Sequence, residues 1–273
     1  MISRFSDTDM KKLLRVTIID LRKTLVSYGT IVCIAAVFLL CFASTVYTDG
    51  FTGKEYTVLE VIADRRKLPQ MRLASLDIVR SSVNPYLTLF LPVLSSIPFV
   101  TLFCAERLSG NIRFIITRTG KLEYAFSKFF SAIISGALTV TIGFILYSLV
   151  ILSVFGRDGA LSDIIRIYAG TAIYGAVSVL PAFLLSSFIR NKYMICCFPF
   201  IFMHFYYTVL AKLQAHYIDN WNVIMKINML YTNNIKDIFF THDKSTMLFY
   251  TIMTAAVFAV YSFMMNRRLD NGQ

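Results

Sequence analysis

Six long stretches of this chain contain no Asp, Glu, Lys or Arg, and they constrain its fold more than any other feature. They cover residues 24–48, 81–105, 129–156, 167–189, 193–211 and 245–266, with lengths of 25, 25, 28, 23, 19 and 22 residues. About 20 apolar helical residues cross the hydrocarbon core of a bilayer. A soluble core has little room for six such stretches, and helices satisfy their own backbone where water is absent. The sequence therefore predicts an all-α integral membrane protein, one domain with six transmembrane spans.

The composition supports this prediction. Hydrophobic residues make up 56% of the chain and charged residues 16%, against about 25% charged in an ordinary soluble domain. All five cysteines fall inside the predicted spans, so no disulfide framework is expected. The first apolar stretch is too long for a cleaved signal peptide, and acidic residues precede it.

The distribution of basic residues predicts the orientation. With the N-terminus in the cytoplasm, the inside segments hold 15 Lys and Arg in 56 residues, whereas the outside segments hold 12 in 75 residues. Basic residues concentrate on the cytoplasmic side of membrane proteins. Both termini are thus expected in the cytoplasm, with the chain in the plasma membrane. The net charge of +11 then reflects topology, and no nucleic-acid partner is expected.

Residues 9–23 predict a helix in the plane of the cytoplasmic interface. Its apolar side carries Met10, Leu13, Leu14, Thr17, Ile18 and Leu21, and its basic side Lys11, Lys12, Arg15, Arg22 and Lys23. Such a helix rests on membrane lipids with its basic side chains near anionic headgroups. A solvated segment leading into the first span is the alternative.

Two outside segments have features of their own. Thr57 followed by Glu60 predicts a capping box and a short helix to about residue 66. Segment 212–244 mixes apolar and polar residues, which favours short helices at the outer interface.

Within the spans, small residues and prolines are the features that bear on packing. Ala132 with Gly136, and Ala172 with Ala176, are spaced to let helices approach closely. Prolines that can kink a helix are Pro92, Pro98, Pro181 and Pro199. Both features are common in static and in moving bundles.

Motifs for catalysis are missing from the sequence. It contains no H-E-x-x-H metal motif, no G-x-S-x-G elbow and no G-x-x-x-x-G-K-[ST] phosphate loop. The one ionisable candidate within a span is His204, and its aromatic neighbours favour a packing role over a proton relay. The chain is therefore not expected to be an enzyme or to hold a metal or cofactor.

The cytoplasmic loop 106–128, between the second and third spans, is the segment where energy could enter from a partner. It interleaves charged residues with Ile and Phe, and Gly110 and Gly120 punctuate it. This pattern predicts a short amphipathic helix between two turns, which could dock on a cytoplasmic protein.

The same loop carries a resemblance to a known family. Glu106, Arg107 and Gly110 directly after the second span resemble the E-R-x-x-G motif of type-2 ABC export permeases. The later stretch from Arg118 to Lys121, followed by Tyr124 and Lys128, is similar to the residues that lead into that family's third span. The overall plan, an interfacial helix followed by six spans, is also similar.

This resemblance implies a function and partners. Loop 106–128 would be the coupling helix, and the ATPase-coupling residues would be Glu106, Arg107, Gly110, Arg113, Arg118 and Lys128. A separate P-loop ATPase subunit would bind ATP and Mg²⁺, and a second permease, identical or paralogous, would complete a dimer. A bacterial host is implied too. Charge-free spans favour apolar or amphipathic cargo such as a lipid, a peptide or a drug.

Two other classes compete with this interpretation. A small channel or an uncoupled carrier would transport without any ATPase. An intramembrane enzyme of another type would have to use His204 and tyrosines.

Overall fold

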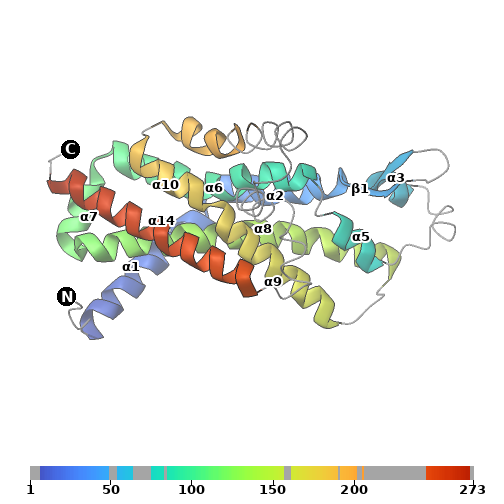
Figure 1. The fold of residues 1–273 in the computed structure, drawn as a ribbon, viewed down its shortest axis with the longest axis horizontal. Helices are drawn as coiled ribbons and strands as arrows, with labels where there is room; N and C mark the ends of the chain where they lie inside the picture. Colours follow the sequence, from blue (N-terminus) through green and yellow to red (C-terminus); the bar gives the residue numbers. More distant parts are fainter. Residues whose placement is uncertain are drawn as a thin grey trace, which may run out of the picture.

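The computed structural model describes residues 7–48, 54–63, 75–82, 85–156, 161–189, 191–201, 205 and 244–270. Nearly all of these residues are helical, and they form an elongated bundle (Figure 1). Three helical segments are long and apolar enough to cross a membrane, namely Phe90–Leu108, Lys121–Phe155 and Ser162–Phe188. A fourth joins them if the bent pair Lys11–Leu25 and Tyr28–Phe42 counts as one span. The α-helical class with several membrane-length helices is confirmed, whereas six crossings remain a prediction.

The predicted N-terminal helix exists, and the first predicted span is shorter than expected. Helix α1 covers Asp7–Leu25 and helix α2 covers Tyr28–Phe42, with a bend of 60° between them. Ser27 caps α2, because its hydroxyl accepts a hydrogen bond from the backbone N–H of Thr30 at 3.3 Å. The chain therefore changes direction at Ser27, immediately before α2 begins. Apolar residues continue after Phe42, but the backbone there leaves the helix, which corrects the predicted span 24–48.

A small β-hairpin, which the sequence did not predict, follows α2. Strand β1, Thr45–Thr48, pairs antiparallel with β2, Glu55–Thr57. Helix α3, Val58–Ala63, begins at the predicted capping box: the N–H of Thr57 donates to Glu60 Oε2 at 3.0 Å, and the N–H of Glu60 donates to Thr57 Oγ1 at 3.4 Å. The short helix α5 covers Ser75–Ser81. The capping box is confirmed, and residues 64–66 of the predicted helix lie outside the described residues.

Helix α8 is the centre of the bundle. It covers Lys121–Phe155 and packs against α1, α2, α6 and α9. Helix α6 covers Pro85–Leu108, and α9 covers Leu161–Ser178. The helix starts eight residues before the predicted span 129–156, because Lys and Glu are good helix formers and a charge does not end a helix. Between α6 and α8 lies the short helix α7, Asn111–Thr119. Its position between Gly110 and Gly120 agrees with the predicted short helix between two turns, whereas a coupling role of loop 106–128 remains a prediction.

The remaining spans are described in part. The predicted span 167–189 is divided into α9, Leu161–Ser178, and α10, Leu180–Phe188, with Pro181 in the first turn of α10. In the predicted span 193–211 a helix covers Lys192–Ile201. His204 and segment 206–243 lie outside the described residues. Helix α14 covers Lys244–Asp270 and contains the predicted last span.

Close helix contact is made by glycines rather than by the predicted alanine pair. Gly136 on α8 faces Gly175 on α9, and a Cβ atom added at Gly136 would lie 2.9 Å from the Gly175 carbonyl oxygen. Ala172 and Ala176 are only half-buried. The prediction for Gly136 is thus supported, and its partner on α9 is Gly175.

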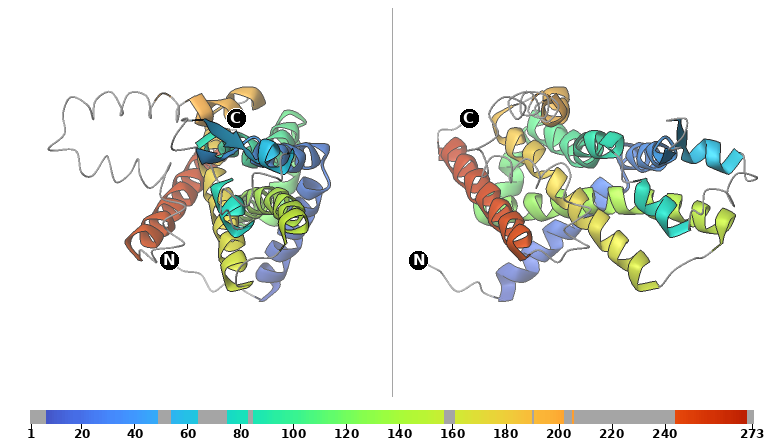
Figure 2. Two further views of the ribbon diagram at one scale, coloured as in Figure 1. Left: turned by 90° about the vertical axis from the view of Figure 1, so that its right-hand side faces the viewer. Right: turned by 45° about the vertical axis from the view of Figure 1, so that its right-hand side comes forward.

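The bundle has two different ends. Helix α7, the start of α1 and the end of α14 lie at one end, whereas β1 and α3 lie at the other (Figures 1 and 2). Two apolar clusters follow this division. One cluster includes Phe103, Tyr124 and Ile116 near α7, and the other includes Val58 and Ile78 near the hairpin.

Candidate functional site

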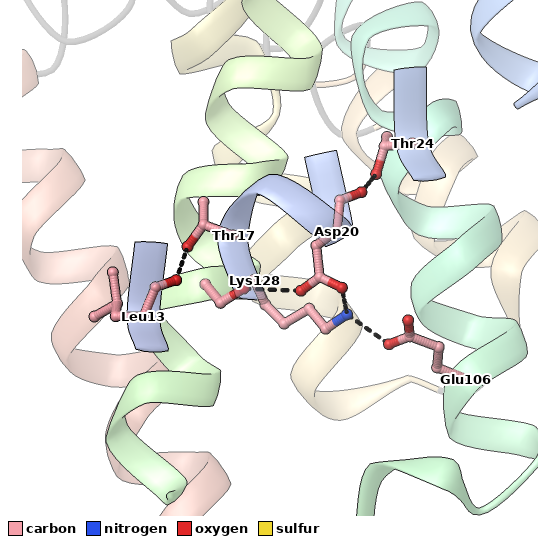
Figure 3. A network of polar contacts seen from close by, with 7 residues as sticks. Leu13, Thr17, Asp20, Thr24, Glu106 and Lys128 are labelled. Carbon is pink, nitrogen blue, oxygen red and sulfur yellow. Dashed lines mark hydrogen bonds and ion pairs between the residues drawn. The ribbon is translucent and has the colours of Figure 1, made fainter. Parts of the chain in front are cut away.

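A buried network of three charged side chains joins α1, α6 and α8 close to α7. The ammonium Nζ of Lys128 lies 3.0 Å from Asp20 Oδ1 and 2.6 Å from Glu106 Oε2. The side chains of Lys128, Asp20 and Glu106 are only 5%, 9% and 16% exposed. Figure 3 shows the ammonium between the two carboxylates. We call this set of residues the Asp20–Lys128–Glu106 network.

Asp20 is bound more completely than Glu106. Its second oxygen, Oδ2, accepts a hydrogen bond from Ser127 Oγ at 2.8 Å, so both of its oxygens are held by α8. The contact of Glu106 Oε2 with Lys128 is an ion pair by distance but lacks the geometry of a hydrogen bond. The network therefore has one carboxylate with two contacts to α8, Asp20, and one carboxylate with a single short ion pair, Glu106.

Helical periodicity explains why Asp20 points inward. Residues 13, 17, 20 and 24 lie on one side of α1 at the spacing of helix turns. Thr24 and Asp20 are buried there, and Leu13 and Thr17 are half-buried, whereas Lys12 and Arg15 on the other side are exposed. Asp20 is not among the site residues predicted from the sequence. Its signal was present, because a lone carboxylate in an apolar helix face needs a buried partner.

A small pocket adjoins the network. Its volume is about 10 Å³, roughly the space that one water molecule needs. The polar groups in its wall are Asp20, Lys23, Thr24, Glu106, Lys128 and Ser131. Phe99, Leu102 and Phe103 close the apolar side. The pocket is too small for a cargo molecule.

Two tyrosines pack near the network from different helices. The ring of Tyr124, one turn before Lys128 on α8, has its centroid 5.4 Å from Lys128 Nζ. Tyr261 of α14 is fully buried in the same apolar cluster as Tyr124. Neither hydroxyl has a hydrogen-bond partner among the described residues. The aromatic surroundings lower the local dielectric, which strengthens the attraction between the charges.

Arg107 ties the same end of α6 to α10. Its guanidinium Nη1 donates to the carbonyl oxygens of Ser186 at 2.7 Å and Ile189 at 3.1 Å. These are among the last carbonyls of a helix, which lack partners within the helix and attract a cation. Glu106 and Arg107, although adjacent in sequence, therefore bind two different neighbours.

Helix α7 is the exposed element next to this network. Leu108 is 76% exposed and Phe114 70% exposed, whereas Ile116 is buried against the bundle. Gly110, with φ +72°, and Gly120, with φ +100°, bound the helix. These backbone conformations favour glycine and allow the chain to reverse direction at both ends of α7. The result is a short helix with one face on the bundle and one face free.

The predicted coupling residues occupy three kinds of place. Glu106, Arg107 and Lys128 point into the bundle, so they could act on a partner only through the helices that they hold. Gly110 and Arg118 are exposed at α7. Arg113 belongs to α7, but its side chain lies outside what the structure describes.

The network connects three helices and so can transmit a displacement. Among the described residues, no group of His, Cys, Asp and Glu is arranged to hold a metal ion. A buried ion pair holds helices in register, and removal of one partner strands a charge in an apolar environment. The network thus connects α6 and α8, the two neighbours of α7, to α1, and Arg107 connects α6 to α10.

Comparison of the chain with protein-family models, with curated proteins and with solved structures finds no match.

Proposed function

We propose that this chain is the transmembrane permease subunit of an ATP-driven exporter, and that a separate P-loop ATPase supplies the energy. The observation that carries this proposal is α7. It is a short helix with exposed Phe114, placed between two long apolar helices at one end of the bundle, and the last residue of α6, Leu108, is exposed beside it. Exposed apolar groups on a short helix that is charged elsewhere are typical of a protein docking surface.

The contacts around α7 support its role in coupling. Helix α7 packs on α6 and α8, and the charged residues just outside it bind α1, α8 and α10. A partner that pushes on α7 thus acts on four helices through polar contacts. Polar contacts in an apolar bundle are geometrically specific, so they transmit a displacement rather than absorb it.

The membrane arrangement in this proposal has six crossings with both termini and α7 in the cytoplasm. The start of α1, the end of α14 and α7 share one end of the bundle (Figure 1), as this topology requires. The hairpin and α3 would then cover the outer side. A second permease, identical or paralogous, would form the other half of the pathway.

The proposed cargo is apolar or amphipathic, such as a lipid, a peptide or a drug. The charged network lies at the α7 end, and the long apolar stretch of α8 beyond it contains no charged residue. A path along such helices has no group to bind an ion or a highly charged solute. ATP and Mg²⁺ would bind in the partner ATPase.

Site-specific photo-crosslinking tests the proposal in the native membrane. A photoreactive phenylalanine analogue at Phe114 should crosslink to a protein that contains a P-loop, identified by mass spectrometry. The matched control places the same analogue at Leu59 on α3, which is 58% exposed at the other end of the bundle. We expect no ATPase crosslink from position 59.

Further results decide between the alternatives. Phe114→Asp should reduce recovery of the ATPase in mild detergent by at least tenfold, because a loss of about 1.4 kcal/mol in binding gives that factor. Leu59→Asp should leave it unchanged. Absence of any P-loop protein from both the crosslink and the purified complex contradicts the proposal. Transport by the purified chain alone in liposomes would instead favour a channel or an uncoupled carrier.

A further inference from the structure

Asp20 and Glu106 are held by different numbers of contacts with α8. Both oxygens of Asp20 are bound by adjacent residues of α8, Ser127 at 2.8 Å and Lys128 at 3.0 Å. Glu106 has one contact among the described residues, the ion pair with Lys128 at 2.6 Å, and its side chain is the most exposed of the three. The connection between α1 and α8 therefore rests on two contacts, one of them independent of Lys128, whereas the connection between α6 and α8 rests on a single ion pair.

We propose that Asp20 is a positioning residue that keeps Lys128 fixed to α1 and α8 while Glu106 separates from it when α7 moves. The proposal thus divides the network into a permanent connection, α1 to α8, and a releasable connection, α6 to α8. It rests on the proposed function only for the source of the movement, since the inequality of the two connections is a property of the chain itself.

The chain path explains why Glu106 is the group that moves. Glu106 lies in the last turn of α6, and Gly110 joins α6 to α7 in a left-handed backbone conformation. Glu106 lies about one helical turn before Gly110, whereas Lys128 lies about two turns after Gly120 within the 35-residue helix α8, so a displacement of α7 reaches Glu106 over the shorter path. Asp20 lies on α1, which is not joined to α7 by a short segment of chain. The pocket beside Glu106 leaves room for about one water molecule to hydrate the separated groups.

The charge of Lys128 is shared between Asp20 and Glu106, and this sharing predicts opposite effects on α6 when one or the other carboxylate is neutralised. Two carboxylates share one ammonium. Because the two negative charges repel each other, each carboxylate reduces the net attraction that holds the other at Lys128. Neutralising Glu106 releases α6 from α8. Neutralising Asp20 has the opposite effect on α6, because the whole charge of Lys128 becomes available to Glu106. If the network only contributed stability, neutralising either Asp20 or Glu106 would loosen both the α1–α8 and the α6–α8 connection.

Distances between spin labels measure the two connections separately. One label is placed at Leu149 on α8, and the second at Ile19 on α1 or at Leu108 on α6. All three side chains are substantially exposed, at 56%, 47% and 76%. Leu149 lies 21 residues after Lys128 on the same helix, roughly 31 Å along its axis, which suits pulsed electron resonance. The exposed Cys197 is replaced by serine.

The first measurements use the full chain alone in lipid nanodiscs, with Glu106→Gln, Asp20→Asn and Ser127→Ala. Glu106→Gln should broaden the distribution of 108–149 distances and leave the 19–149 distribution unchanged. The population in which α6 is separated from α8 should rise about tenfold. Asp20→Asn should broaden 19–149 and leave 108–149 unchanged or narrower. Ser127→Ala, which retains all charges, should broaden 19–149 less than Asp20→Asn does. Asp77→Asn, at an exposed carboxylate on α5, is the control and should change neither distance.

Equal broadening of both distances by Asp20→Asn and Glu106→Gln would overturn the proposal. Size-exclusion profiles identify any variant that fails to fold, and Ser127→Ala provides the test in that case: if it broadens 108–149 instead of 19–149, the proposal is wrong.

A second set of measurements uses the assembled complex with its ATPase, with and without ATP and vanadate. The label on α6 is moved from Leu108, which belongs to the proposed docking surface, to the exposed Ala105. Nucleotide should change the 105–149 distance and leave 19–149 unchanged. If no ATPase assembles, the proposed function fails while the measurements on the chain alone still decide the inequality. If the ATPase assembles and nucleotide changes 19–149 as much as 105–149, the division into permanent and releasable connections is wrong.

Discussion

Lys128 is the residue on which the α7 end of the bundle depends most directly. Its ammonium is almost completely shielded from solvent and lies within 3.0 Å of carboxylates from two other helices. A buried ion pair contributes little net stability compared with apolar residues of the same size, but removal of one partner is costly. Lys128 therefore fixes the arrangement of α1, α6 and α8 more than it adds to the total stability.

Lys128→Met should destabilise the protein by about 3–5 kcal/mol, because Asp20 and Glu106 would then be buried together without a cation. The measurement is thermal or denaturant unfolding in detergent. Lys12→Met, at an exposed position on α1, is the matched control and should change the stability by less than about 0.5 kcal/mol.

A compensated variant separates charge from packing. When Asp20→Asn and Glu106→Gln accompany Lys128→Met, no unpaired charge remains, and most of the lost stability should return. A triple variant as unstable as Lys128→Met alone would mean that packing, and not the stranded charge, causes the loss.

Helix α8 is the element that organises the rest of the fold. Its 35 residues contact most other helices of the described chain, and small or polar side chains line much of its buried surface. Membrane helices associate through close packing of small residues, since lipid supplies no hydrophobic driving force between them. Gly136 and Gly143 show this best: added Cβ atoms would lie 2.9 Å from carbonyl oxygens of α9 and α2, respectively.

Gly136→Ala should separate α8 from α9 and destabilise the protein by about 1–3 kcal/mol, as overpacking does elsewhere. The matched control is Gly29→Ala on α2, where an added Cβ atom has its nearest neighbours at 3.7 Å. Alanine is the better helix former, so the control should be neutral or slightly stabilising. Thermal unfolding in detergent measures both; equal melting temperatures for the two variants would contradict the close contact.

At the scale of the whole molecule, the two ends of the bundle differ in structure. Helix α7 and the start of α1 lie at one end, and the hairpin and α3 lie at the other (Figure 2). The charged network and the exposed basic residues Lys11, Lys12 and Arg15 of α1 belong to the α7 end. The first end suits the cytoplasmic side, where basic residues concentrate and an ATPase could bind.

Labelling of single cysteines with a membrane-impermeant maleimide checks this orientation in a Cys197→Ser background. Leu59→Cys on α3 should react in intact cells, and Lys12→Cys on α1 should react only after permeabilisation. Both side chains are exposed, so neither depends on unfolding to react. Reaction of both positions in intact cells would contradict a transmembrane arrangement with these ends on opposite sides.

The sequence by itself determined the features that depend on local physics. Apolar stretches indicated a helical membrane-type protein, Thr57 and Glu60 determined the start of α3, and Gly110 and Gly120 determined α7. Each depends on hydrophobicity or on backbone preferences within a few residues, so each can be predicted without knowledge of the rest of the chain. Charge-free stretches did not predict helix ends correctly, because helices such as α8 continue through charged residues.

Only the tertiary structure decided which residues meet across the bundle. Asp20 and Ser127 are separated by 107 residues, and no local pattern pairs them. The same holds for Glu106 turning toward α8 while Arg107 turns toward α10, and for Gly175 rather than Ala172 facing Gly136. These contacts depend on how whole helices are oriented against one another. The physical reason is that a charge buried in an apolar bundle must find its partner wherever the fold places one.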